Sequence, residues 1–155
     1  MSLSWQEPSD YKSRPVCVLG GGVLGRRIAA CFVAAGHHVR IRDPMEKARN
    51  DAVTYIKENL GSFTSQTAHD AGTYEAVESI VDGVKDCWLV FEAVPEVLKV
   101  KIDTFADLEK SAPADCILAS NSSSYKTSEM LEKVQDATKH RILNTHFFMP
   151  PEVRH

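Results

Sequence analysis

Four short stretches of the chain contain residue types that bind phosphate or move protons. In order, they are GGGVLG at 20–25, EAVPEVLKVK at 92–101, SNSSS at 120–124 and THFF at 145–148. Each lies at the end of an apolar run of the kind that forms a buried strand. Because ligands in open α/β sheets bind outside the carboxyl ends of the strands, we expect the four stretches to meet at one edge of a sheet.

The glycine-rich stretch has the spacing of a dinucleotide-binding turn. Gly20, Gly22 and Gly25 form a GxGxxG pattern, with Val23 and Leu24 between the last two glycines. The first glycine permits a tight turn, the second lets a pyrophosphate approach the backbone, and the third lets the next helix pack close to the strand. N–H groups at the start of that helix would face the anion. The alternative is that the three glycines only let the chain turn.

An acidic residue stands where a ribose ligand is expected. Asp43 ends the second predicted strand, 18 residues after Gly25, and its carboxylate could accept hydrogen bonds from both ribose hydroxyls. Its charge would repel a 2′-phosphate, so the pattern predicts NAD rather than NADP as the cofactor. Arg42, beside it, is a group that could attract that phosphate.

Strand-like and helix-like segments alternate along the chain and would position these stretches. The predicted strands are 16–19, 38–42, 74–78, 88–94, 116–120 and 142–148. Helices are predicted from Leu24 to Ala35, closed by Gly36, at 44–60, ended by Gly61, at 80–85, after Pro95 and from about Ser128, with 62–71 as a loop. Six strands with crossovers predict an α/β fold: a Rossmann-type doubly wound, mainly parallel sheet with helices on both faces.

Composition narrows the class of protein. A chain of 155 residues, 43% of them apolar, suffices for one α/β domain. The net charge of −3 gives no basic surplus for nucleic acid, and the longest wholly apolar stretch, 28–35, is too short to cross a membrane. We expect a soluble, cytoplasmic protein with an N-terminal extension at 1–14 and a dinucleotide-binding domain at 15–155.

The cysteines and histidines do not predict a metal site. The four cysteines are widely separated, without a CxxC pair, and lie in or beside apolar runs, so we expect buried, reduced thiols. His37 and His38 are adjacent in a predicted strand and would point to opposite faces, while His140 and His146 lack a matching arrangement of carboxylates.

Together, the four motifs resemble the NAD-binding domain of 3-hydroxyacyl-CoA dehydrogenases. GGGVLGRRIAACFVAAGH, FEAVPEVLKVK, ILASNSSS and THFFMPP stand in the family's order and approximate spacing, from Pro15 to Val153. The resemblance implies an oxidoreductase of fatty acid metabolism that uses NAD to interconvert an L-3-hydroxyacyl-CoA and the 3-ketoacyl-CoA. Relatives that oxidise other 3-hydroxy compounds, such as gulonate- or carnitine-type dehydrogenases, look similar.

The resemblance also implies roles for individual residues. The three glycines match the family's cofactor loop, and Asp43 matches the acid that binds the ribose. Glu96 and Lys101 match residues near the nicotinamide ribose. Asn121 and Ser123 match the loop between cofactor and substrate, and His146 matches the catalytic histidine. Imidazole titrates near neutrality and can take the proton of a 3-hydroxyl as hydride leaves C3 for the nicotinamide. Hydrogen bonds from the matched loop would orient the substrate oxygen and the ring.

Each assignment has a structural alternative. His146 could be a hydrogen-bonded histidine at a strand end, and the serines could form an ordinary loop with hydroxyl-to-backbone bonds. Glu96 and Lys101 could lie on a solvated helix face. Glu92 is interpreted as a structural group at the end of the sheet, not as a catalyst.

The chain departs from the family in three places. Met149 stands where the family usually has Asn, and the segment after the second strand is shorter than the helical excursion that helps to hold CoA. The family's glutamate partner of the histidine, and a helical domain with the dimer contact, would lie beyond His155. We therefore expect the cofactor half of a two-domain, homodimeric enzyme that binds NAD(H) but, in these 155 residues, turns over negligible substrate. The alternatives are a dehydrogenase of a small 3-hydroxy acid and a non-catalytic NAD(H)-binding module.

Overall fold

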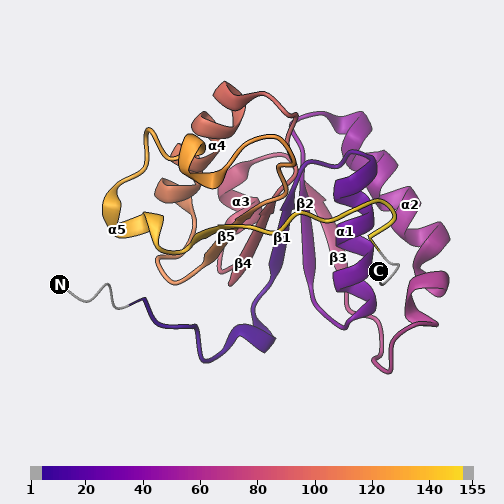
Figure 1. Cartoon of the computed structure of the whole chain (residues 1–155). Coiled ribbons are helices and arrows are strands. Elements are labelled where there is room, and N and C mark those ends of the chain that lie inside the picture. Colours follow the sequence, from indigo (N-terminus) through magenta and orange to yellow (C-terminus); the bar gives the residue numbers. More distant parts are fainter. Residues whose placement is uncertain (1–4, 152–155) are drawn as a thin grey trace.

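Six parallel strands form the centre of the molecule, in the order β3-β2-β1-β4-β5-β6 (Figure 1). The computed structural model describes residues 5–151; residues 1–4 of the expected extension and 152–155 of the expected domain lie outside the described residues. The strands are β1 (Val16–Leu19), β2 (Val39–Arg42), β3 (Tyr74–Val77), β4 (Leu89–Glu92), β5 (Ile117–Ser120) and β6 (Ile142–Asn144). The predicted Rossmann-type sheet is confirmed.

Helices cover both faces of this sheet (Figure 1). On one face lie α1 (Val23–Ala34) and α2 (Glu46–Thr64), and on the other lie α3 (Ile80–Val84) and α4 (Leu98–Ser111). Shorter elements are the 3-10 helices η1 (Tyr11–Ser13) and η2 (Thr127–Met130) and the single turn α5 (Asp136–Lys139). Within residues 5–151, every helix is too short or too polar to span a membrane.

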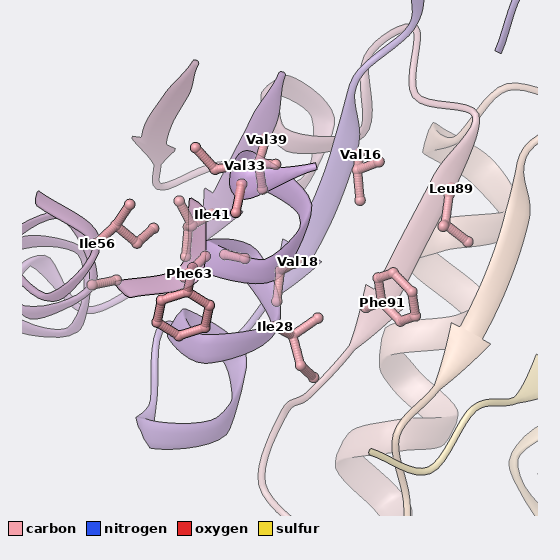
Figure 2. Close-up of a cluster of buried hydrophobic side chains, with 14 of the residues drawn as sticks. Val16, Val18, Ile28, Val33, Val39, Ile41, Ile56, Phe63, Leu89 and Phe91 are labelled. Carbon is pink, nitrogen blue, oxygen red and sulfur yellow. The ribbon is translucent and has the colours of Figure 1, made fainter. Parts of the chain in front are cut away.

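The alternation of side chains along β1 divides the interior into two cores. Val16 and Val18 point into the core beneath α1 and α2, which Figure 2 shows, whereas Cys17 and Leu19 point into the core beneath α3 and α4. All four residues are fully buried. A strand buried on both faces carries apolar residues at every position, which is why this short run is readable as a strand.

Several predicted element bounds are wrong, and residues 62–64 of the predicted loop 62–71 are helical. Gly61 does not end the second helix, because α2 continues to Thr64 and thereby carries Phe63, 5% exposed, into the first core. Gly36, by contrast, has a φ of 91° and closes α1 as predicted. The helix predicted from Ser128 is also wrong, since this region forms η2 and α5 instead. The fourth and sixth strands are shorter than predicted.

The cysteines are placed as the sequence predicts for buried thiols, with one exception. None of the four is in a disulfide, and Cys17, Cys87 and Cys116 are buried in the second core, whereas Cys31 is partly exposed. Burial raises the pKa of Cys87 and that of Cys116 to about 12 each, and raises the pKa of Cys17 as well. The three thiols therefore stay protonated at neutral pH.

These environments predict the reactivity of the thiols. In the native protein only Cys31 should react readily with a chromogenic aromatic disulfide near pH 8, because a thiol whose pKa is about 12 is only about 0.01% thiolate there. The other three should react after unfolding in denaturant. Cys31→Ser should abolish the early absorbance change, and early reaction of two or more thiols in the native protein would contradict the placement.

Candidate active site

The glycine loop connects β1 to α1 and brings the two elements into close contact. Gly20 has a φ of 109°, and a Cβ placed on it would lie 2.4 Å from the carbonyl oxygen of Ala93. A Cβ on Gly25 would lie 1.9 Å from the carbonyl oxygen of Gly20, so a side chain there would push α1 away from the strand. A Cβ on Gly22 would meet nothing within 4 Å. The loop thus leaves open space at Gly22, the residue that immediately precedes α1.

The carboxylate of Asp43 lies against this loop. One oxygen, Oδ2, accepts a hydrogen bond from the N–H of Gly21 at 2.8 Å, and Oδ1 accepts one from the N–H of Met45 at 2.9 Å. Arg49, which the sequence analysis did not single out, donates from Nη1 to the carbonyl oxygens of Asp43 and Pro44 at 2.8 and 3.1 Å. The acid and the open side of the loop are therefore held side by side at the end of β2.

A cavity of about 190 Å³ opens at the same edge of the sheet, beside the loop. Six predicted site residues line it, from the start of α1, the β4–α4 segment, the loop after β5 and the segment after β6. The lining residues are Leu24, Ala93, Val94, Glu96, Lys101, Asn121, Ser123 and His146. Val23, at the start of α1, is 56% exposed and does not line this cavity.

The structure rules out a solvated helix face for Lys101. Its side chain is 1% exposed, and its Nζ lies 2.8 Å from Oε1 of Glu92 and 3.0 Å from Oε2 of Glu96. Burial acts to raise the pKa of Glu96, but hydrogen bonds from the Ser122 hydroxyl, the Ser124 N–H and the Lys101 ammonium outweigh it and lower this pKa to about 2. Glu96 is therefore an anion at the cavity over the whole neutral range.

The loop after β5 is bonded to the segment that carries His146. Asn121 accepts a hydrogen bond through Oδ1 from the N–H of Phe147 at 2.6 Å. The His146 ring lies against Phe148, with centroids 4.5 Å apart, and among residues 5–151 no group hydrogen-bonds to the imidazole. An exposed imidazole whose nitrogens have no protein partner in this part of the chain is open to a ligand.

Glu92 has more contacts than its sequence interpretation suggested. It is fully buried at the end of β4 and bonded to Lys101 and to the hydroxyl of Ser120, a residue of the SNSSS stretch to which the sequence assigned no individual role. The signal was an acidic residue inside the apolar run WLVFEAV, since a buried carboxylate needs a cation and hydrogen-bond donors.

The chain is similar to a family of known proteins. Residues 15–155 match the family described as 3-hydroxyacyl-CoA dehydrogenase, NAD binding domain. The glyoxysomal fatty acid beta-oxidation multifunctional protein MFP-a of Brassica napus is 32% identical over 148 residues, which cover 92% of this chain and 20% of that protein. L-carnitine dehydrogenase/betainyl-CoA thioesterase of Agrobacterium fabrum is 32% identical over 139 residues, 87% of this chain and 28% of that protein.

A solved structure shows the same likeness. The structure of 3-hydroxybutyryl-CoA dehydrogenase from Escherichia coli matches with a TM-score of 0.79 at 28% identity, covering 91% of this chain and 31% of that one. The chain therefore spans about a fifth to a third of the length of these three relatives.

The contact between Gly25 and Gly20 predicts a selective loss of stability. Gly25→Ala should destabilise the fold by about 1–3 kcal/mol, because backbone must move to admit the methyl group. Gly61→Ala is the matched control: it lies in α2 with open space around its Cβ position, so it should stabilise by about 0.5–1 kcal/mol. Thermal melting compares the two, and equal melting temperatures would contradict the close contact.

Proposed function

The chain belongs to the 3-hydroxyacyl-CoA dehydrogenase family, and on this premise we propose that it is the NAD-binding part of an enzyme that interconverts an L-3-hydroxyacyl-CoA and the 3-ketoacyl-CoA. NAD is the cofactor of this family. The observation that carries the proposal is that the open glycine loop, the Asp43 carboxylate and the cavity with His146 meet at one edge of the sheet.

The residues at the loop fit a dinucleotide. N–H groups at the start of α1 would hold the pyrophosphate in the space that a side chain at Gly22 would occupy. Asp43 would accept hydrogen bonds from the adenosine ribose, and Leu24 would separate the pyrophosphate from the cavity, with Val23 contributing its N–H at the turn. Glu96 and Lys101 would face the ribose on the nicotinamide side.

The bound cofactor supplies the acceptor for the hydride of the substrate carbon. His146 takes the proton of the 3-hydroxyl in the oxidation and returns it in the reduction. Its nitrogens have no other partner among residues 5–151, so they can reach the hydroxyl. Asn121 and Ser123 orient the substrate oxygen and the nicotinamide ring by hydrogen bonds, and the bond from Phe147 to Asn121 keeps this loop next to the histidine.

A second candidate substrate is a small 3-hydroxy acid. Residues 65–73 connect α2 directly to β3, without the helical excursion that the sequence analysis associates with CoA. The relative from Agrobacterium fabrum is named as an L-carnitine dehydrogenase. A substrate screen with longer protein, comparing acetoacetyl-CoA with small 3-keto acids, separates the two candidates.

We extend the proposal to the domain organisation, oligomeric state and cell compartment of the enzyme. Residues 15–155 would act as one domain beside a helical domain that completes the site and forms a homodimer, in the cytoplasm. The relatives' greater length and the absence of disulfides among the four cysteines support this view. Native mass and cell fractionation are the tests.

Cofactor choice is the first functional prediction. The chain should bind NADH at least about tenfold more tightly than NADPH, because the 2′-phosphate would meet the Asp43 carboxylate. Asp43→Ala should weaken NADH binding about tenfold, the effect of a lost hydrogen bond to a charged group. Fluorescence titration measures both, with Asp51→Ala, an exposed acid of α2, as control. Tighter binding of NADPH than of NADH by the unmodified chain would overturn the assignment.

The second functional prediction concerns turnover. The 155 residues should bind NADH yet oxidise it negligibly with acetoacetyl-CoA, because a cavity of about 190 Å³ cannot enclose an acyl-CoA and the imidazole has no orienting carboxylate among residues 5–151. Robust turnover that His146→Ala abolishes would contradict this expectation while supporting the role of the histidine.

A further inference from the structure

We propose that Glu92 is a positioning residue for the nicotinamide side of the site, acting through Lys101 and Ser120 on the groups that line the cavity. The inference rests on the proposed binding of NAD at this edge of the sheet. It assigns a function to a carboxylate that does not itself line the cavity.

Both oxygens of the buried Glu92 side chain are occupied. Oε1 accepts hydrogen bonds from Nζ of Lys101 at 2.8 Å and from the N–H of Val94 at 2.9 Å, and Oε2 accepts one from the Ser120 hydroxyl at 2.6 Å. Val94 and Lys101 line the cavity, and Ser120 immediately precedes the loop that does. One carboxylate thereby joins β4, the first turn of α4 and the end of β5.

Lys101 transmits this constraint to Glu96. Its ammonium has three hydrogens, and these face Glu92, Glu96 and, at 3.5 Å, the carbonyl oxygen of Val94. Glu96 in turn accepts hydrogen bonds through Oε1 from the Ser122 hydroxyl and, at 2.9 Å, from the Ser124 N–H. Lys101, which lines the cavity, is thus bonded to the buried Glu92 on one side and to Glu96, another lining residue, on the other.

Ser120 transmits the constraint to the serine loop. Because its hydroxyl hydrogen is given to Glu92, its oxygen is oriented to accept the N–H of Ser122, at 3.2 Å. The backbone of Glu92 adds a bond at the same point, since its carbonyl oxygen accepts the N–H of Asn121 at 2.9 Å. The loop that carries Asn121 and Ser123 is therefore hydrogen-bonded to Glu92 through its Asn121 N–H and, by way of Ser120, through its Ser122 N–H. It is also hydrogen-bonded to Glu96.

The energetic cost of this arrangement favours a functional reason for it. A buried ion pair contributes little net stability compared with an apolar pair of similar volume, since both charges lose their hydration. Glu92 and Lys101 are 0% and 1% exposed, so they carry that cost in full. What they provide that an apolar pair would not is a fixed direction for the ammonium and for the Ser120 hydroxyl.

Glu92→Gln tests the inference. The amide can keep one acceptor for Lys101 and Val94, but its NH2 group must face Ser120, so the Ser120 oxygen accepts from residue 92 instead of donating to it. The hydroxyl hydrogen then loses its buried acceptor, and the orientation in which the Ser120 oxygen accepts the Ser122 N–H is no longer fixed. Lys101 retains Glu96 as its counterion, so the variant leaves no lone buried charge. We expect the Kd for NADH to rise about tenfold and that for ADP, which has neither the nicotinamide nor its ribose, to change less than about twofold.

Ser120→Ala is the second variant, and it removes only one oxygen atom from the network. It should also raise the Kd for NADH by about threefold or more and leave the Kd for ADP unchanged. Lys99→Met is the matched control: Lys99 lies in the same turn of α4 as Lys101, but its side chain is 81% exposed and pairs with Asp103. It should leave both affinities unchanged.

The ligands separate the possible outcomes. Direct fluorescence titration with NADH and competition with ADP should show that the two variants lose affinity for NADH only. The enhancement of nicotinamide emission at saturation should also be smaller in the variants than in the unmodified chain. Equal loss of NADH and ADP, or no loss of either in Glu92→Gln and Ser120→Ala, would overturn the positioning role and leave the proposed function intact. If Glu92→Gln does not fold, Ser120→Ala alone decides. Failure of the unmodified chain to bind NADH would instead remove the proposed function itself.

Discussion

The close contact between Gly25 and the backbone of Gly20 is the constraint on which the site depends. It lets the first turn of α1 lie directly on the end of β1, with no side chain between them. The first turn of α1 then starts at the edge where the parallel strands end, next to the open space at Gly22. A larger residue at Gly25 would have to move the start of α1, which carries Leu24 at the cavity.

A second constraint comes from polar groups placed where a parallel sheet is most buried. β4 lies between β1 and β5, and Glu92 at its end is in register with Leu19 and Ser120. Water cannot reach a carboxylate at this position, so its hydrogen bonds must come from protein. The groups that supply them belong to the segments that line the cavity, and the satisfaction of one buried charge therefore also orders the site.

The sequence predicted much of the fold because its signals were local. Val16–Leu19 is apolar at each position and is followed by glycines with distinct steric tasks, so strand, turn and helix could be placed together. Gly61 failed as a helix end because the packing of Phe63, a tertiary effect, decides where α2 stops. Glu96 and Lys101 were identified by resemblance, but the burial of Lys101 depends on Glu92, and such mutual dependence cannot be read from spacing alone.

The strand order also has a consequence for biosynthesis. β1 is the first strand among residues 5–151, yet it lies between β2 and β4, and β4 comes after all of β2, α2, β3 and α3. As a nascent polypeptide leaves the ribosome, β2 can pair with β1 early, whereas the other side of β1 has no partner strand until Leu89–Glu92 has emerged. An open, apolar strand edge attracts other chains. Until Leu89–Glu92 is available, that side of β1 is therefore an edge to which another chain could pair.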